Sequence, residues 1–136
     1  MFAPIETLLP HRAPMQWIDA LTACTDTTAS ATVCFTAEHF AVADGAVLET
    51  ALVECMAQTV AAAMGHRAQT NGKSNRAENG VLAAVTNFRI HSQPPLEKTL
   101  LIEVRELRRF GPMLQIAGDI SCAGQPIASG ELTLHV

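Results

Sequence analysis

The chain contains no tyrosine and one tryptophan, and aromatic residues make up only 4% of its 136 residues. Basic residues are also few: 9 lysines and arginines stand against 13 aspartates and glutamates, which gives a formal net charge of −4. Nucleic-acid-binding domains usually present a surplus of positive charge, and single strands are bound on aromatic side chains. The composition therefore argues against a nucleic-acid partner.

Glycine and proline are not enriched, with 8 and 7 residues, and no heptad repeat is sustained. A collagen-like chain, a coiled coil and a disordered chain are excluded, since 49% of the residues are hydrophobic. This length and this apolar content suffice for one hydrophobic core. We therefore expect a single domain that spans residues 1–136.

The chain shows no secretory signal, because Met1–Pro10 has no basic start and no long apolar run. The four cysteines form no Cys-x-x-Cys pair and have no histidine at metal-ligand spacing; they are Cys24, Cys34, Cys55 and Cys122. We expect reduced thiols in a cytoplasmic protein without a bound metal. The alternative for two of them is a disulfide between Cys24 and Cys34 across a hairpin.

One long segment has a helical composition. The stretch Ala46–Gly65 lacks proline and internal glycine, and Ala, Leu, Met, Glu and Gln dominate it. We expect Asp44 or Gly45 to cap its start and its final glycine to end it. The length would suit a membrane span, but Glu49 and Glu54 would be costly in lipid. The sequence therefore predicts a helix buried nearly all round, without a membrane span.

The other segments are mainly strands with alternating apolar residues. A run of strands follows the helix without further helices between them, which favours an α+β fold with an antiparallel sheet of about six strands wrapped around the helix. The polar stretch Arg67–Asn79 is predicted to be a surface loop. The other predicted elements are a helical turn at Ile5–Leu9 and strands at Met15–Thr22, Ala29–Phe35, Val81–Ile90, Thr99–Leu107, Met113–Cys122 and Ile127–Val136.

Glu54 is the residue of greatest chemical interest, because it lies in the middle of the apolar helix. A carboxyl group there would be desolvated, and desolvation favours the protonated form, which suits a general acid. Gln58 lies one helical turn later and could hold the carboxyl group by a hydrogen bond. The alternative is structural: Glu54 would face water or pair with an arginine of the sheet.

His39 is the second candidate, in the loop that leads to the helix. A lone loop histidine is most often a solvated surface residue. Its position just before the helix favours a functional role, since a helix N-terminus stabilises a developing oxyanion. The candidate catalytic residues are therefore His39 and Glu54.

Several segments carry motifs that occur in this order in one enzyme family. The matching segments are Leu9–Met15 with Trp17–Asp19, His39–Phe40, Val53–Gln58, Arg108–Gly111 and Ala123–Ala128. They resemble bacterial 3-hydroxyacyl-acyl carrier protein dehydratases of the hot-dog fold, and the Pro-His-Arg and Glu-x-Met-Ala-Gln pieces are the most specific. The stretch Ala41–Leu48 departs from the family, which has a Pro- and Gly-rich stretch there. The chain is therefore most similar to a divergent branch, the predicted dehydratases of aryl-polyene-type biosynthesis.

This resemblance implies a hydro-lyase that converts 3-hydroxyacyl thioesters on acyl carrier protein to trans-2-enoyl thioesters, in fatty-acid or polyene-type biosynthesis. It implies that His39 removes a proton from the carbon beside the thioester carbonyl, and that Glu54 protonates the departing hydroxyl. The backbone amides at Val47 and Leu48 would polarise the carbonyl, and Gln58 would complete the substrate site. The family needs no metal and no organic cofactor.

The family also works as a dimer in which both subunits build each active site. We expect a homodimer or a higher homo-oligomer in which the apolar strand Val81–Ile90 pairs with its copy. A paralogous subunit is an alternative partner. A basic cluster could receive an acidic carrier protein, or could be ordinary solvated charge; its members are Arg67, Lys73, Arg76, Arg105, Arg108 and Arg109.

Two other functions stay open from the sequence. A hot-dog thioesterase would use Glu54 or Asp44 to activate water. A weakly catalytic acyl-binding subunit would complete a hetero-oligomeric dehydratase, and the altered loop after His39 motivates that hypothesis. The other histidines receive no catalytic role. His11, with Arg12, is expected to fix a proline-flanked turn, and the remaining three are expected at the surface or at strand edges; they are His66, His91 and His135.

Overall fold

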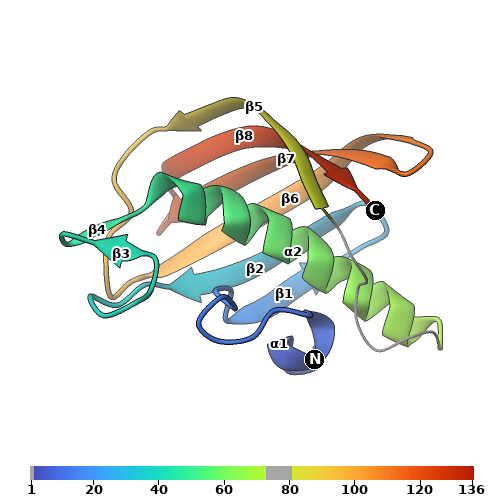
Figure 1. The fold of residues 1–136 in the computed structure, drawn as a ribbon, viewed down its shortest axis with the longest axis horizontal. Helices are drawn as coiled ribbons and strands as arrows, with labels where there is room; N and C mark the ends of the chain where they lie inside the picture. The colour runs from blue at the N-terminus through green and yellow to red at the C-terminus, as the bar shows by residue number, and fades with distance from the viewer. Residues whose placement is uncertain (1, 73–80) are drawn as a thin grey trace.

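The computed structural model describes residues 2–72 and 81–136, in which one sheet curves around one long helix (Figure 1). The sheet has six strands, all paired antiparallel, in the order β1-β2-β6-β7-β8-β5. The strands are β1 (Ala20–Cys24), β2 (Thr28–Cys34), β5 (Val81–Ile90), β6 (Thr99–Phe110), β7 (Met113–Cys122) and β8 (Gln125–His135). The predicted α+β class with a sheet wrapped around one helix is confirmed.

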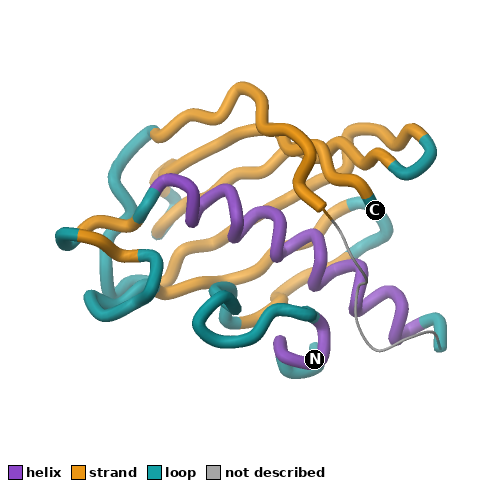
Figure 2. Tube along the Cα trace, viewed as in Figure 1, coloured by secondary structure: helices purple, strands orange, loops and turns teal. Residues whose placement is uncertain are grey.

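Helix α2 (Glu49–Thr70) crosses the inner face of the sheet, and the short helix α1 (Ile5–Leu8) packs against it (Figures 1 and 2). The core consists of the underside of α2 and the inward-facing aliphatic residues of the sheet. The helix lies close to strand β7, since a β-carbon at Gly118 would lie 2.7 Å from the sulfur of Met56. This packing fixes the height and rotation of α2, and with it the position of the side chains on its other face.

The helix begins later than predicted, after a small hairpin of β3 (Val42–Ala43) and β4 (Ala46–Val47). Asp44 and Gly45 form the turn of this hairpin with positive φ values of 52° and 76°, so their predicted role as helix caps is wrong. An Asp-Gly pair suits such a two-residue turn, because both central residues need a positive φ. The actual N-cap is Leu48, whose side chain makes no capping hydrogen bond.

The predicted helix end at Gly65 is also wrong, because the helix continues beyond it. Gly65 serves the packing of α1 instead, since a β-carbon there would overlap the carbonyl oxygen of Leu8. The last turn is held by Arg67, whose guanidinium donates two hydrogen bonds to the carbonyl oxygen of Thr25, at 3.0 and 2.6 Å. The predicted surface loop therefore starts too early, and its residues 73–79 lie outside the described part of the chain.

Within one chain every helix residue from 51 to 69 is buried or half-buried, so the prediction of burial nearly all round agrees with the structure except at the two helix ends. A stripe at helical spacing is half-exposed, and it consists of Glu54, Ala57, Ala61 and Met64. The composition of α2 could not reveal which residues form this half-exposed stripe, because alanine occurs both in contacts with a sheet and along cavities. In the described part of the chain, no helix has the length and apolar character of a membrane span.

The first strand also starts later than the predicted segment Met15–Thr22. Ahead of β1, the backbone N–H groups of Trp17 and Ile18 donate to the side chain of Gln58, at 3.0 and 3.2 Å. These two backbone N–H groups are therefore hydrogen-bonded to a helix side chain rather than to a neighbouring strand. The alternating apolar residues could not distinguish these two solutions.

Candidate active site

Glu54 lies in the second turn of α2, on the face turned toward strands β5 and β8. Its side chain is 32% exposed in the single chain, so it is half-buried rather than fully desolvated. It lines a cavity of about 70 Å³ together with His11. The rest of the cavity is apolar, with Ala57, Val60, Ala61, Met64, Leu82, Leu134 and Val136 as its lining. The carboxyl group thus faces a small apolar space in which it has one titratable neighbour among the described lining residues.

Gln58 connects Glu54 to the N-terminal segment. Its side chain is fully buried, and its oxygen accepts hydrogen bonds from the N–H groups of Trp17 and Ile18. Its amide nitrogen donates to the carbonyl oxygen of Met15 at 2.7 Å and to Oε1 of Glu54 at 3.4 Å. The predicted hydrogen bond between Gln58 and Glu54 is therefore present, while contact of Gln58 with substrate stays a prediction.

His11 also reaches Glu54, which the sequence did not indicate. Its Nε2 lies 3.4 Å from Oε1 of Glu54. The turn that carries it is held by Arg12, whose guanidinium donates to the carbonyl oxygens of Leu9 and His11, at 2.9 and 2.7 Å. The predicted structural turn is thus real, but it also places the imidazole over the helix. One sequence signal could have pointed to such a contact. Glu54 and Gln58 are polar residues on an apolar helix and need hydrogen-bond partners, and the proline-flanked segment that carries His11 can supply one.

His39 lies elsewhere, in the turn between β2 and β3, and it is half-buried. Its ring packs edge-on against Phe35, with ring centroids 4.8 Å apart, and against Trp17, at 6.1 Å. Burial lowers the pKa of His39, and the negative charge of Asp19 acts in the opposite direction. His39 and Glu54 of one chain are therefore linked indirectly, through Trp17 and Gln58, and their catalytic roles stay predictions.

The backbone of the turn determines which nitrogen of His39 carries a proton. The N–H group of Ala41 donates a hydrogen bond to Nδ1 at 2.9 Å. A nitrogen that accepts a hydrogen bond carries no proton, so the neutral ring holds its proton on Nε2. In this conformation Nε2 is a hydrogen-bond donor, and it accepts a proton only after the ring has released Ala41.

The predicted carbonyl-binding amides are at Val47 and Leu48. Val47 pairs with Val42 in the β3–β4 hairpin, and its side chain is buried. The N–H group of Leu48 donates to the carbonyl oxygen of Ala41 at 2.9 Å. Val47 also lines an open hollow of about 510 Å³ at the start of α2. The role of these two amides in substrate binding stays a prediction, and it requires the Leu48 amide to leave Ala41.

The thiols and the metal-ligating side chains do not suggest another chemistry. All four cysteines are free, and the predicted alternative of a disulfide is wrong, because Cys24 lies opposite Ala29 in the β1–β2 register. Burial, together with the charges of Glu54 and Asp19, raises the pKa of the Cys55 thiol far above its ordinary value, so this thiol stays protonated. Among the described residues, no three histidine, cysteine or carboxylate side chains gather in a metal-binding group.

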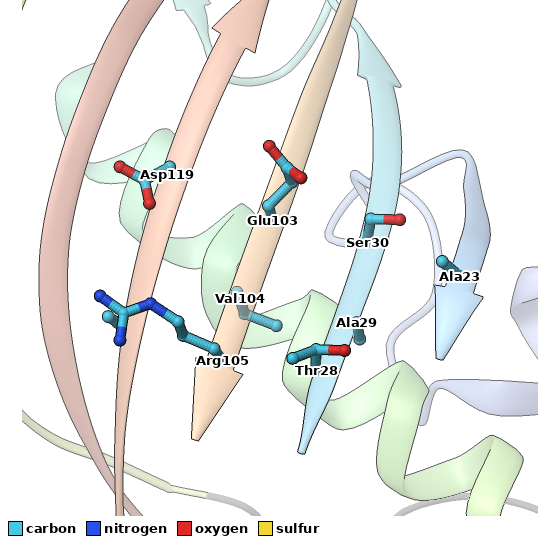
Figure 3. Close-up of a pocket in the computed structure, with 9 residues that line it drawn as sticks. Ala23, Thr28, Ala29, Ser30, Glu103, Val104, Arg105 and Asp119 are labelled. Atoms are coloured by element: carbon cyan, nitrogen blue, oxygen red, sulfur yellow. The ribbon is translucent and has the colours of Figure 1, made fainter. Parts of the chain in front are cut away.

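Another hollow, of about 330 Å³, lies on the outer face of the sheet, away from α2 (Figure 3). Glu103 of β6 and Asp119 of β7 stand directly opposite each other there, and Arg105 lies beside them. The remaining lining residues are small or apolar: Ala23, Thr28, Ala29, Ser30, Val104 and Ala117. The sheet separates this hollow from Glu54, so it is not part of the candidate active site.

Comparisons with known proteins show which family and which fold the chain resembles. The ApeP-like family, described as ApeP dehydratase, matches residues 3–136. No curated protein matches. The dehydratase heterocomplex ApeI:P from Xenorhabdus doucetiae is 22% identical with a TM-score of 0.89, over 99% of this chain and 91% of that one.

More distant structures share the fold. A homologue of HP0420 from Helicobacter felis is 13% identical with a TM-score of 0.71, over 99% of this chain and 90% of that one. A hypothetical thioesterase from Streptococcus pneumoniae, solved with coenzyme A, is 13% identical with a TM-score of 0.67, over 86% of each chain. The match along residues 3–136 confirms the resemblance to hot-dog dehydratases of the aryl-polyene type, and the chain belongs to the ApeP-like dehydratase family.

Proposed function

We propose that this chain removes water from 3-hydroxyacyl thioesters on acyl carrier protein and forms trans-2-enoyl thioesters, in polyene-type or fatty-acid biosynthesis. The observation that carries the proposal is Glu54, whose carboxyl group faces an apolar cavity and is held at one oxygen by two side chains. A carboxyl group in such surroundings suits a general acid. Membership of a dehydratase family supports the same class of reaction.

The proposed reaction needs one base and one acid. The base takes a proton from C2, the electron pair of that bond forms the C2=C3 double bond, and the C3–O bond breaks. Glu54 donates its proton to the departing hydroxyl, which leaves as water. We assign the base to His39 of the partner subunit, because His39 and Glu54 of one chain are linked only through other residues.

The surroundings of His39 favour a base through its pKa and the nearby Asp19 charge, but its hydrogen bond from Ala41 opposes that role. The lowered pKa favours the neutral ring, and the Asp19 carboxylate stabilises the imidazolium that forms when the ring takes a proton. The hydrogen bond from Ala41 to Nδ1, however, leaves the proton on Nε2. Proton abstraction at Nε2 therefore requires the turn to release Nδ1 when substrate binds.

The edge of the sheet supports a two-subunit site. Strand β5 pairs with β8 on one side only and is exposed along nearly its whole length. Its exposed apolar side chains are Val81, Leu82, Val85 and Ile90. Such an edge is a template for another strand, and Leu82 also lines the Glu54 cavity. We propose a homodimer or higher homo-oligomer, or a pair with a paralogous hot-dog subunit, formed along β5.

We propose that an acidic carrier protein binds at the turn between β6 and β7. Arg108 lies over the ring of Phe110, 5.8 Å from its centroid, and Phe110 is 62% exposed. Arg109 pairs with Glu106 at 3.3 Å, and Arg105 lies nearby on β6. Of the other predicted members of the basic cluster, Arg67 lies in the last turn of α2, where its guanidinium binds the carbonyl oxygen of Thr25. Lys73 and Arg76 lie outside the described residues. With such a carrier as its partner, we place the protein in the cytoplasm.

The proposed function is tested by incubation of the purified protein with a 3-hydroxyacyl thioester on acyl carrier protein and on coenzyme A. We expect loss of one water, seen by mass spectrometry, and absorbance of a conjugated enoyl thioester. Release of a free thiol without an enoyl product would instead show a thioesterase. The ratio of the two rates identifies the preferred carrier.

One observation favours a second candidate function, a weakly catalytic acyl-binding subunit of a hetero-oligomeric dehydratase. In this conformation His39 presents a proton donor rather than a base, because Ala41 occupies Nδ1. Under this alternative the chain alone is inactive, and activity appears when a paralogous hot-dog subunit is co-expressed. Full activity of the chain alone would exclude it.

A further inference from the structure

We propose that His11 is a positioning residue for Glu54: with Gln58 it binds Oε1 of the carboxyl group and leaves Oε2 as the oxygen that carries the transferable proton. The inference rests on the proposed function, because it assigns a role to His11 in the acid step. The contacts that carry it are the two donors that converge on Oε1, His11 Nε2 and Gln58 Nε2, each 3.4 Å away.

The orientation of the Gln58 amide follows from its partners. Two backbone N–H groups, of Trp17 and Ile18, face one end of the amide, so that end must be the oxygen. The other end faces the carbonyl oxygen of Met15, which accepts only a donor. The nitrogen of Gln58 therefore presents its second hydrogen toward Glu54, and Gln58 is a fixed donor.

The tautomer of His11 follows from burial. Its Nδ1 is buried and has no hydrogen-bond partner, although the side chain as a whole is 29% exposed. A buried N–H group without an acceptor costs about 1–3 kcal/mol, and an unsatisfied lone pair is tolerated more readily. The proton of the neutral ring therefore sits on Nε2, where it points to Oε1 of Glu54.

A protonated carboxyl group has one oxygen that accepts hydrogen bonds and one that carries the proton. Because two fixed N–H donors face Oε1, the proton of Glu54 sits on Oε2. No other described lining residue of the cavity is titratable: β5 contributes Leu82, β8 contributes Leu134, and Val136 follows β8. On the helix itself, Cys55 is buried and protonated. His11 is thus the titratable side chain that sets the geometry of the acid.

The test compares three variants of the full chain. His11→Leu removes the donor, and His11→Gln restores an N–H group at similar reach. We expect His11→Leu to lower kcat roughly tenfold, in line with one lost hydrogen bond, with KM changed less than about twofold because a positioning residue acts on the transition state. His11→Gln should recover most of kcat. His66→Leu is the matched control: His66 also contacts the N-terminal segment, through Phe2, but lies away from Glu54.

A second readout does not depend on turnover. Carbon-13 NMR of protein labelled at the glutamate carboxyl carbons, recorded at one fixed pH, follows the Glu54 signal, which is identified by its loss in Glu54→Gln. Because the chemical shift of a carboxyl carbon responds to hydrogen bonds at its oxygens, the Glu54 signal should move in His11→Leu and return in His11→Gln. His66→Leu should leave it in place. If His11→Leu unfolds, His11→Phe keeps a ring without a donor and takes its place.

The outcomes separate the two proposals. An unchanged Glu54 carboxyl signal in the donor-free variant, or equal losses of kcat in His11→Leu and His11→Gln, would overturn the role of His11. Full turnover in Glu54→Gln would overturn the proposed function instead, whatever the His11 variants do.

Discussion

The two candidate catalytic residues are held in different ways. Glu54 lies on a long helix whose underside is packed into the core, and side chains from two segments, His11 and Gln58, fix its carboxyl group. His39 lies in a short turn, where backbone groups and two aromatic rings hold its imidazole. The candidate acid, Glu54, is therefore pre-positioned within one chain, whereas the candidate base, His39, must change a backbone contact before it can accept a proton at Nε2. In the single chain, two side chains hold the Glu54 carboxyl group, while the backbone of Ala41 still occupies Nδ1 of His39.

The largest effect that probes this contrast is expected from His39→Ala. If His39 is the base, turnover should fall by roughly 10²–10⁴-fold, the usual contribution of a general base, while the folded structure persists. Steady-state kinetics with a 3-hydroxyacyl thioester measure it, and His66→Ala is the control, since His66 lies near the C-terminal end of α2 and contacts Phe2. Wild-type turnover in His39→Ala would show that His39 is not the base and would contradict this prediction. Absence of turnover in the wild-type chain alone would instead favour the hypothesis of an acyl-binding subunit.

Gly65→Ala tests whether the packing of α1 on α2 holds the N-terminal segment that places His11 beside Glu54. A β-carbon at this position would collide with the carbonyl oxygen of Leu8 and push α1 and the segment that follows it away from α2. We expect the free energy of unfolding to fall by roughly 1–3 kcal/mol, the usual cost of overpacking. Denaturant unfolding measures it. A gain in stability, which helix propensity alone would give, would show that this contact does not hold the N-terminal segment.

The same Gly65→Ala variant links stability to the site. Because His11 follows α1 in the chain, its displacement should move the carbon-13 signal of the Glu54 carboxyl group in the same direction as His11→Leu. A shift without any loss of stability, or a loss of stability without a shift, would separate the packing of α1 from the placement of His11.

Asp19→Asn should have the smallest effect, and it concerns only the base. The carboxylate of Asp19 raises the pKa of His39 against the larger effect of burial, so its loss should lower that pKa further. A base works in its neutral form, and the acidic limb of kcat/KM should therefore move to lower pH. Asparagine can still accept the hydrogen bond from the Cys34 N–H group. Asp119→Asn, on the outer face of the sheet, is the control, and an equal shift in both variants would contradict the assignment.

The sequence predicts most of the fold because its signals are local. Alternating apolar residues mark the strands, and the alanine-rich run marks the helix. The hydrogen bond between Glu54 and Gln58 is also local, because residues four apart share a helix face. The exact helix start depends on the Asp44–Gly45 turn, whose signal competes with the helical composition of Ala46 and Val47.

The rest of the site depends on contacts between distant segments. His11 meets Glu54 only because Gly65 admits α1 and Gln58 binds the backbone of Trp17 and Ile18. No periodicity in either segment encodes that contact. The bond from Ala41 to His39 is local, but it depends on turn geometry rather than on residue type.

The central claim is that Glu54 supplies the proton that releases water. Glu54→Gln preserves the shape of the side chain and removes the transferable proton. We therefore compare the rate of enoyl-thioester formation by the wild-type protein and by Glu54→Gln, at equal folded concentration. The account predicts that the wild type forms the enoyl product and that Glu54→Gln forms essentially none, with its fold retained by circular dichroism. Equal rates in the two proteins would contradict it.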